Sequence, residues 1–82
     1  INNLSEKQII IYPNPTSGKV NIKLPKGEVL QFTLTDLLGK IILQKDNISN
    51  KYIFETKDFA KGTYLIKLEN VKGKYIRKLL IE

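Results

Sequence analysis

The chain has 82 residues, 41% of them hydrophobic, and its 14 Lys and Arg outnumber its 8 Asp and Glu to give a net charge of +6. This length predicts one small domain, and the hydrophobic fraction excludes an intrinsically disordered chain. The sequence contains no Cys, His, Met or Trp. It therefore offers no thiol nucleophile, no imidazole base and no zinc site with nitrogen or sulfur ligands, and we expect neither a metal nor a cofactor.

Residues 1–8 are polar and show no periodicity, which predicts a linker or a frayed end. The chain begins at Ile1 rather than at Met, so we expect it to be part of a longer protein. No apolar run approaches the roughly 20 residues of a membrane helix, and no signal peptide is visible. We therefore expect residues 9–82 to form the domain and no segment of the chain to span a membrane.

The first half of the domain alternates apolar and polar residues, a pattern typical of half-buried strands. Residues 9–12 and 19–24 predict two strands. Between them, Pro13 and Pro15 fix the backbone and remove two hydrogen-bond donors. The segment 12–18 therefore predicts a rigid loop that also protects a sheet edge, with a ligand-binding loop as the alternative.

Residues 31–44 predict a hairpin that folds back at a turn over residues 36–39. Asp36 can accept hydrogen bonds from the backbone N–H groups that follow it, and Gly39 allows a positive φ. On the returning strand, alternation places Ile41 and Leu43 on one face, and Ile42 and Gln44 on the other. The polar residues 45–50 then predict a loop.

The second half predicts strands over residues 51–56, 63–69 and 74–82. In the irregular connection between the first two, we expect Phe59 to fill one end of the core. Gly62 there predicts either a positive φ or a close approach of the backbone. The last strand has apolar residues on both faces, which suits either a central strand or a surface that another protein grips. About seven short strands separated by turns predict an all-β fold, a small Ig-like antiparallel β-sandwich.

The chemistry-bearing residues do not predict an enzyme. The carboxylates form no closely spaced cluster, the serines have no His to activate them, and the glycines form no phosphate-binding loop. Arg77 is the one Arg among the 14 basic residues. Proteins that recognise nucleic-acid bases use mainly Arg for this contact, so the composition does not favour such a role. The Lys residues therefore predict a solvated surface and no nucleic-acid partner, although an anionic partner remains the alternative.

Four short motifs point to a particular family of β-sandwich domains. They are Tyr-Pro-Asn-Pro-Thr-Ser-Gly at residues 12–18, Asp-Leu-Leu-Gly-Lys at 36–40, Gly-Thr-Tyr at 62–64 and Lys-Leu-Leu-Ile at 78–81. In this order and spacing, over nearly the whole chain from residue 9 to residue 82, they resemble the type A C-terminal sorting domain of the type IX (Por) secretion system. Phe59, where the family often has Leu, is a mild departure.

The resemblance implies a β-sandwich at the C-terminus of a secreted Bacteroidota protein, joined by a linker to an upstream cargo. It implies that the domain directs this cargo from the periplasm across the outer membrane, to the cell surface or the medium. The implied partners are the type IX outer-membrane translocon and a sortase-type cysteine protease. That protease would cut the linker, and the cargo would in some cases be attached to a lipopolysaccharide.

The resemblance also assigns roles to residues. Seven motif positions are expected to be mainly structural, namely Pro13, Asn14, Pro15, Asp36, Gly39, Gly62 and Tyr64. The terminal positions Lys78, Leu79, Leu80 and Ile81 are candidates for recognition by the translocon, because a last strand can offer edge hydrogen bonds and apolar side chains together.

The alternative is a non-catalytic binding module of the carbohydrate-binding or fibronectin-like kind. Such a module should expose aromatic side chains or contain a calcium loop, whereas the Tyr and Phe residues here fall mostly at inward positions.

Overall fold

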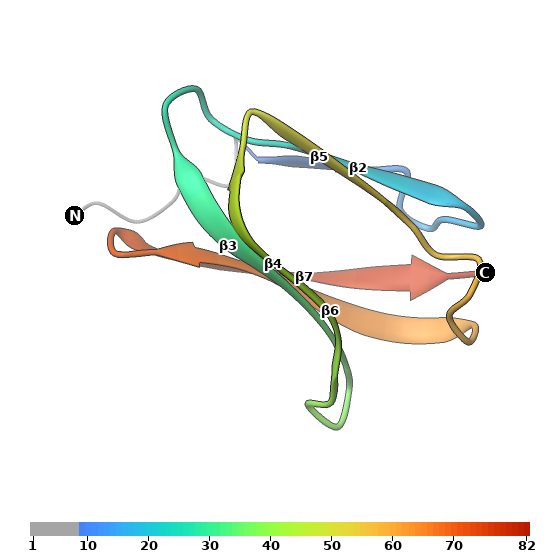
Figure 1. Ribbon diagram of the computed structural model, residues 1–82. Coiled ribbons are helices and arrows are strands. Elements are labelled where there is room, and N and C mark those ends of the chain that lie inside the picture. The colour runs from blue at the N-terminus through green and yellow to red at the C-terminus, as the bar shows by residue number, and fades with distance from the viewer. Residues whose placement is uncertain (1–8) are drawn as a thin grey trace.

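The computed structural model describes residues 9–82, which form two antiparallel sheets packed face to face (Figure 1). One sheet has the order β1-β2-β5 and the other β4-β3-β6-β7. The strands are β1 (Ile10–Tyr12), β2 (Lys19–Lys23), β3 (Val29–Asp36), β4 (Ile41–Ser49), β5 (Lys51–Glu55), β6 (Gly62–Asn70) and β7 (Gly73–Ile81). The predicted seven-stranded β-sandwich is confirmed. The predicted linker, residues 1–8, lies outside the described residues.

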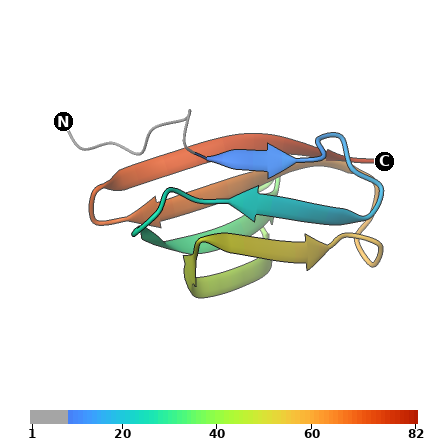
Figure 2. The same ribbon diagram turned by 90° about the horizontal axis from the view of Figure 1, so that it is seen from above.

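Residues 9–82 contain no helix, and so none that is long and apolar enough to cross a membrane. Seen from above, β1, β2 and β5 of the three-stranded sheet run roughly along β6 and β7 of the other sheet (Figure 2).

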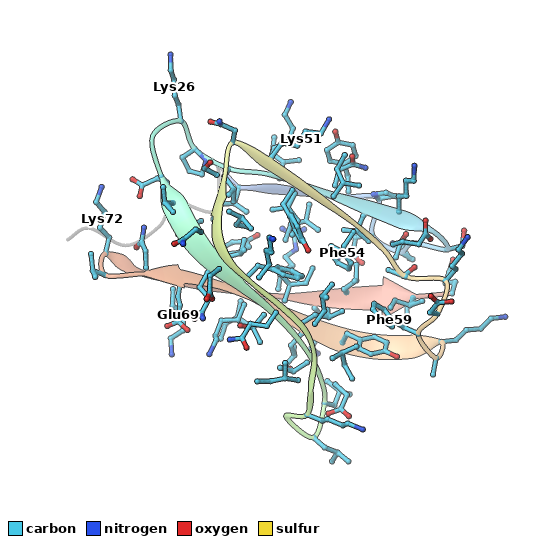
Figure 3. The ribbon with its side chains drawn as sticks, viewed as in Figure 1. Lys26, Lys51, Phe54, Phe59, Glu69 and Lys72 are labelled. Carbon is cyan, nitrogen blue, oxygen red and sulfur yellow. The ribbon has the colours of Figure 1, made fainter. Side chains whose placement is uncertain are left out.

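The core lies between the two sheets, and aromatic side chains from both sheets contact each other within it. The Phe32 ring of β3 lies 5.1 Å from the rings of both Tyr52 and Phe54 of β5, so this contact links the two sheets directly. Phe54 points into the space between the layers (Figure 3). Burying a side chain of this size contributes about 1.5–3 kcal/mol. The other fully buried apolar side chains are Val20, Ile22, Leu30, Leu34, Ile66, Leu68 and Leu79.

The β3–β4 hairpin departs from the predicted alternation. Leu34 pairs with Leu43, but the next residue of β3, Thr35, pairs with Ile41. Ile42 is therefore an extra residue in β4, and this bulge reverses the facing of the residues that follow it. Since paired residues share a face, Leu43 packs toward the core and Ile41 faces outward, 54% exposed. The prediction that Ile41 and Leu43 share a face was wrong.

The polar segment after the hairpin is also different from the prediction. Residues 45–49 continue β4 instead of forming a loop, and Ile48 among them is buried. A second irregularity in the β3–β4 register and a positive φ of 58° at Asn47 accommodate this polar stretch. Asn50, at φ 59°, makes the short connection to β5. Asn tolerates the left-handed region better than most residues, which explains its use at both positions.

The last strand, β7, lies at an edge of the four-stranded sheet and pairs only with β6 among the strands. Of the two alternatives predicted for this strand, a central position is therefore wrong, and a surface that another protein grips stays a prediction. Tyr75, Leu79 and Ile81 point into the core, whereas Ile76 and Leu80 lie on the outer face, 54% and 40% exposed.

The turn between β3 and β4 is built as the sequence predicts. One carboxylate oxygen of Asp36, Oδ1, accepts hydrogen bonds from the backbone N–H groups of Leu38 and Lys40, each at 2.9 Å. Two backbone hydrogen bonds close the turn, from the Asp36 N–H to the Lys40 carbonyl and from the Gly39 N–H to the Asp36 carbonyl. Gly39 has φ 91°, in the region that side chains with a Cβ avoid.

We expect Gly39→Ala to destabilise the domain by about 1 kcal/mol or more, because alanine at this φ is strained. For a domain of this size, that corresponds to a fall in Tm of about 4–8 °C in a thermal melt.

Gly18→Ala is the matched control for this variant. Gly18 has no positive φ, and an added Cβ would lie 3.8 Å from the Glu55 carboxylate, an ordinary contact. An unchanged Tm for Gly39→Ala would show that the turn does not need this glycine.

Candidate functional site at the outer edge of the last strand

The Pro13–Thr16 loop leaves the three-stranded sheet and covers the C-terminal half of β7 in the other sheet. The Asn14 side chain donates from Nδ2 to the Lys78 carbonyl at 2.8 Å and accepts at Oδ1 from the Leu80 N–H at 3.2 Å. Thr16 continues the pairing, since its N–H donates to the Leu80 carbonyl at 2.9 Å and its carbonyl accepts from the Glu82 N–H at 2.7 Å. Thr16 and Ile81 thereby form a short parallel bridge.

The predicted protection of a sheet edge by this loop is confirmed. It also changes the expected mode of recognition. In an antiparallel pair, alternate residues direct their backbone groups away from the partner strand. On this half of β7 the outward groups belong to Lys78 and Leu80. The loop already bonds the Lys78 carbonyl and both the N–H and the carbonyl of Leu80. A partner strand could therefore pair with this half of the edge only after displacing the loop.

The loop is held in place by two buried threonines. Thr16, 2% exposed, donates from its hydroxyl to the Lys19 carbonyl and accepts from the Gly18 N–H. Thr56, 1% exposed, donates from both its hydroxyl, at 2.7 Å, and its N–H to the Gly18 carbonyl. The sequence analysis gave neither threonine a role of its own. A Thr two residues before a Gly is the signal for such a turn.

The structure divides the four terminal recognition candidates into two pairs. Leu79 and Ile81 are buried, 0% and 3% exposed, and belong to the core. Lys78 and Leu80 lie on the outer face of the sheet. A partner that contacts the folded domain can therefore reach only the side chains of Lys78 and Leu80.

The other motifs lie beside this pair of strands. Tyr64 on β6 pairs with Leu79 on one side and with Asp36 on the other. Its hydroxyl donates to the Ala60 carbonyl, and its ring lies 6.5 Å from that of Phe59, which packs against the end of the core as predicted. Gly62 has the predicted positive φ, at 145°, and pairs with Ile81 of β7. Four motifs that are separated in the sequence thus meet at one end of one sheet.

The opposite end of β7 is fixed by an ion pair. Lys72, in the β6–β7 turn, lies 3.0 Å from the Glu28 carboxylate, which also accepts a hydrogen bond from the Asn70 side chain. The hydrogen bond from Lys72 lowers the pKa of Glu28. In residues 9–82 no group of three acidic, His or Cys side chains is placed to hold a metal ion.

A family model described as the secretion system C-terminal sorting domain matches residues 10–82. The chain belongs to this family. The predicted membership in the C-terminal sorting domains of the type IX system is therefore confirmed. The type A subtype stays a prediction.

Among solved structures, the domain is similar to part of PorZ from Porphyromonas gingivalis, an essential bacterial surface component of the type IX secretion system of that organism. The TM-score is 0.75 and the identity is 20%, over 93% of this chain and 12% of the PorZ chain. At this identity the likeness shows a shared fold. None of the curated proteins compared matches the sorting domain.

We expect Asn14→Ala to loosen the end of β7, because the variant loses both hydrogen bonds that the side chain makes to that strand. Each such bond contributes about 0.5–1.5 kcal/mol. Amide hydrogen exchange should show the Leu80 N–H exchanging at least about fivefold faster, since a local loss of this kind opens the strand end before the core.

Asn21→Ala provides the comparison, since Asn21 donates one hydrogen bond, to the Tyr12 carbonyl within the other sheet. It should leave exchange at Leu80 unchanged. Equal exchange at Leu80 in both variants would argue against the clamp.

Proposed function

We propose that residues 9–82 act as a type A C-terminal signal, through which the type IX outer-membrane translocon recognises and exports a cargo joined upstream by residues 1–8. Membership in the sorting-domain family supports this proposal. The observation that carries it is the contact between the first and last motifs, in which Asn14 bonds Lys78 and Leu80 from more than sixty residues away. The sorting motifs thus form one surface in the folded domain.

The translocon reads the folded domain by its exposed side chains in this proposal. Lys78 offers a cation and Leu80 an apolar contact on the same outer face. Leu79 and Ile81 contribute by holding the strand in the core, and Pro13, Asn14 and Pro15 by capping its edge. Asp36, Gly39, Gly62 and Tyr64 shape the neighbouring strands and turns.

The domain is a substrate of secretion and not an enzyme in this proposal. The cargo passes through the periplasm, and a sortase-type cysteine protease cuts the linker after export at the outer membrane. The cargo is then attached to a lipopolysaccharide at the cell surface or released. Contact of the domain with the membrane runs through its protein partners.

The test is export of a fluorescent protein that carries a Sec signal and is fused upstream of residues 1–82, in a Bacteroidota host with and without a working translocon. We expect export only with the translocon. Lys78→Ser/Leu80→Ser should reduce export at least about fivefold, the equivalent of about 1 kcal/mol of binding. Deletion of residues 78–82 is unsuitable, because it removes Leu79 and Ile81 from the core.

Lys74→Ser/Ile76→Ser is the matched control. It removes the same kinds of side chain, at the same spacing, from the same outer face of β7. Thermal melts of both variants establish that they fold. Retention of the folded wild-type fusion in the periplasm of the competent host would overturn the sorting proposal, and equal export of both variants would overturn the role of Lys78 and Leu80.

A further inference from the structure

The turn between β3 and β4 presents two leucines that the fold does not use. Leu38 is 95% exposed and Leu37 is 60% exposed, and Ile41 beside them is 54% exposed. We call these three side chains the leucine tip. Figure 1 shows this hairpin, in green, projecting from the body of the sandwich. Exposed apolar side chains gathered on a projecting turn mark an interaction site more often than a structural need.

The backbone that carries the two leucines is closed by four hydrogen bonds. Two run to Asp36 Oδ1 from the N–H groups of Leu38 and Lys40, and two join the turn's own backbone groups. A partner that binds the tip therefore has little backbone entropy to remove, which favours affinity.

The tip continues into the proposed recognition surface. On the outer face of the sheet, Ile41 pairs with Thr35, Thr35 with Leu65, and Leu65 with Lys78. This row connects the tip to one of the two exposed recognition candidates by direct cross-strand neighbours.

The charges indicate what kind of partner fits. Lys78 ends this row, and Lys40 precedes Ile41 at its other end. Within residues 9–82 neither lysine forms an ion pair. One oxygen of the Asp36 carboxylate, Oδ1, accepts the N–H groups of Leu38 and Lys40. A lipid surface fits less well, because the tip has no aromatic side chain, and each of the two lysines would be attracted to anionic lipid by only about 1 kcal/mol.

We propose that the leucine tip inserts into an apolar pocket with an acidic rim on the translocon protein that receives the domain. This inference rests on the proposed function. A convex tip with two projecting leucines needs a concave partner to remove both from water, and carboxylates at the rim would meet Lys40 and Lys78.

The test compares binding of the 82-residue chain and its variants to the detergent-solubilised translocon complex. Leu37→Ser/Leu38→Ser should weaken binding by at least about tenfold, as expected when anchoring side chains are removed. Lys40→Glu should also weaken binding, most at low salt. Because both leucines are exposed, the Tm should not change, and Leu38→Ser alone serves if the double variant folds poorly.

Val71→Ser is the matched control, since Val71 is fully exposed on the turn at the other end of the same sheet. It should bind within about twofold of wild type. A wild-type chain that neither binds the translocon nor is exported overturns the proposed function itself. A wild-type chain that binds, with equal binding by the leucine variant, overturns only the leucine tip.

Two further measurements address other occupants. Co-sedimentation with vesicles of phosphatidylethanolamine and phosphatidylglycerol tests a lipid surface, and sedimentation over a range of concentrations tests a second copy of the chain. If the wild-type chain binds vesicles or self-associates, and Leu37→Ser/Leu38→Ser does not, the proposal that the leucine tip inserts into a pocket on the translocon would be wrong.

Discussion

The hydrogen bonds from the Pro13–Thr16 loop to the outer edge of β7 hold this end of the sandwich closed. They join the first motif of the chain to the last and connect the two sheets, which share no hydrogen-bonded strand. The domain has no disulfide to perform this task. Its stability therefore depends on packing and on bonds of this kind, as expected for a chain that buries only about 60–65% of its unfolded surface.

In the terminal motif, residues 78–81, alternate residues have different roles: one pair belongs to the fold and the other to the proposed signal. Since side chains of a strand point to opposite faces, Leu79 and Ile81 complete the core while Lys78 and Leu80 remain outside. The motif cannot be removed without opening the core. The proposed signal therefore needs the folded domain, in which the Lys78 and Leu80 side chains lie on the same outer face.

Local patterns in the sequence were sufficient for the strands and turns but not for their irregularities. Alternation predicted β2 and β6, and Asp36 and Gly39 predicted their turn, because these features depend on neighbours in the sequence. The bulge at Ile42 and the continuation of β4 through Asn47 depend on pairing with β3, so alternation alone misplaced them. The Asn14 side chain bonds backbone atoms of β7 that are more than sixty residues away, and no local pattern in the sequence reveals such a contact.

Protection of the sheet edges leaves few places where another protein can bind. The loop covers the C-terminal half of β7, and bulges interrupt β4, so these edges resist pairing with further strands. Lys74 and Lys78 place like charges along β7, which opposes pairing of two copies through it. Backbone pairing is thus opposed along β4 and along the C-terminal half of β7. In the proposed recognition, the translocon therefore contacts the side chains that project from this sheet face and from its turns.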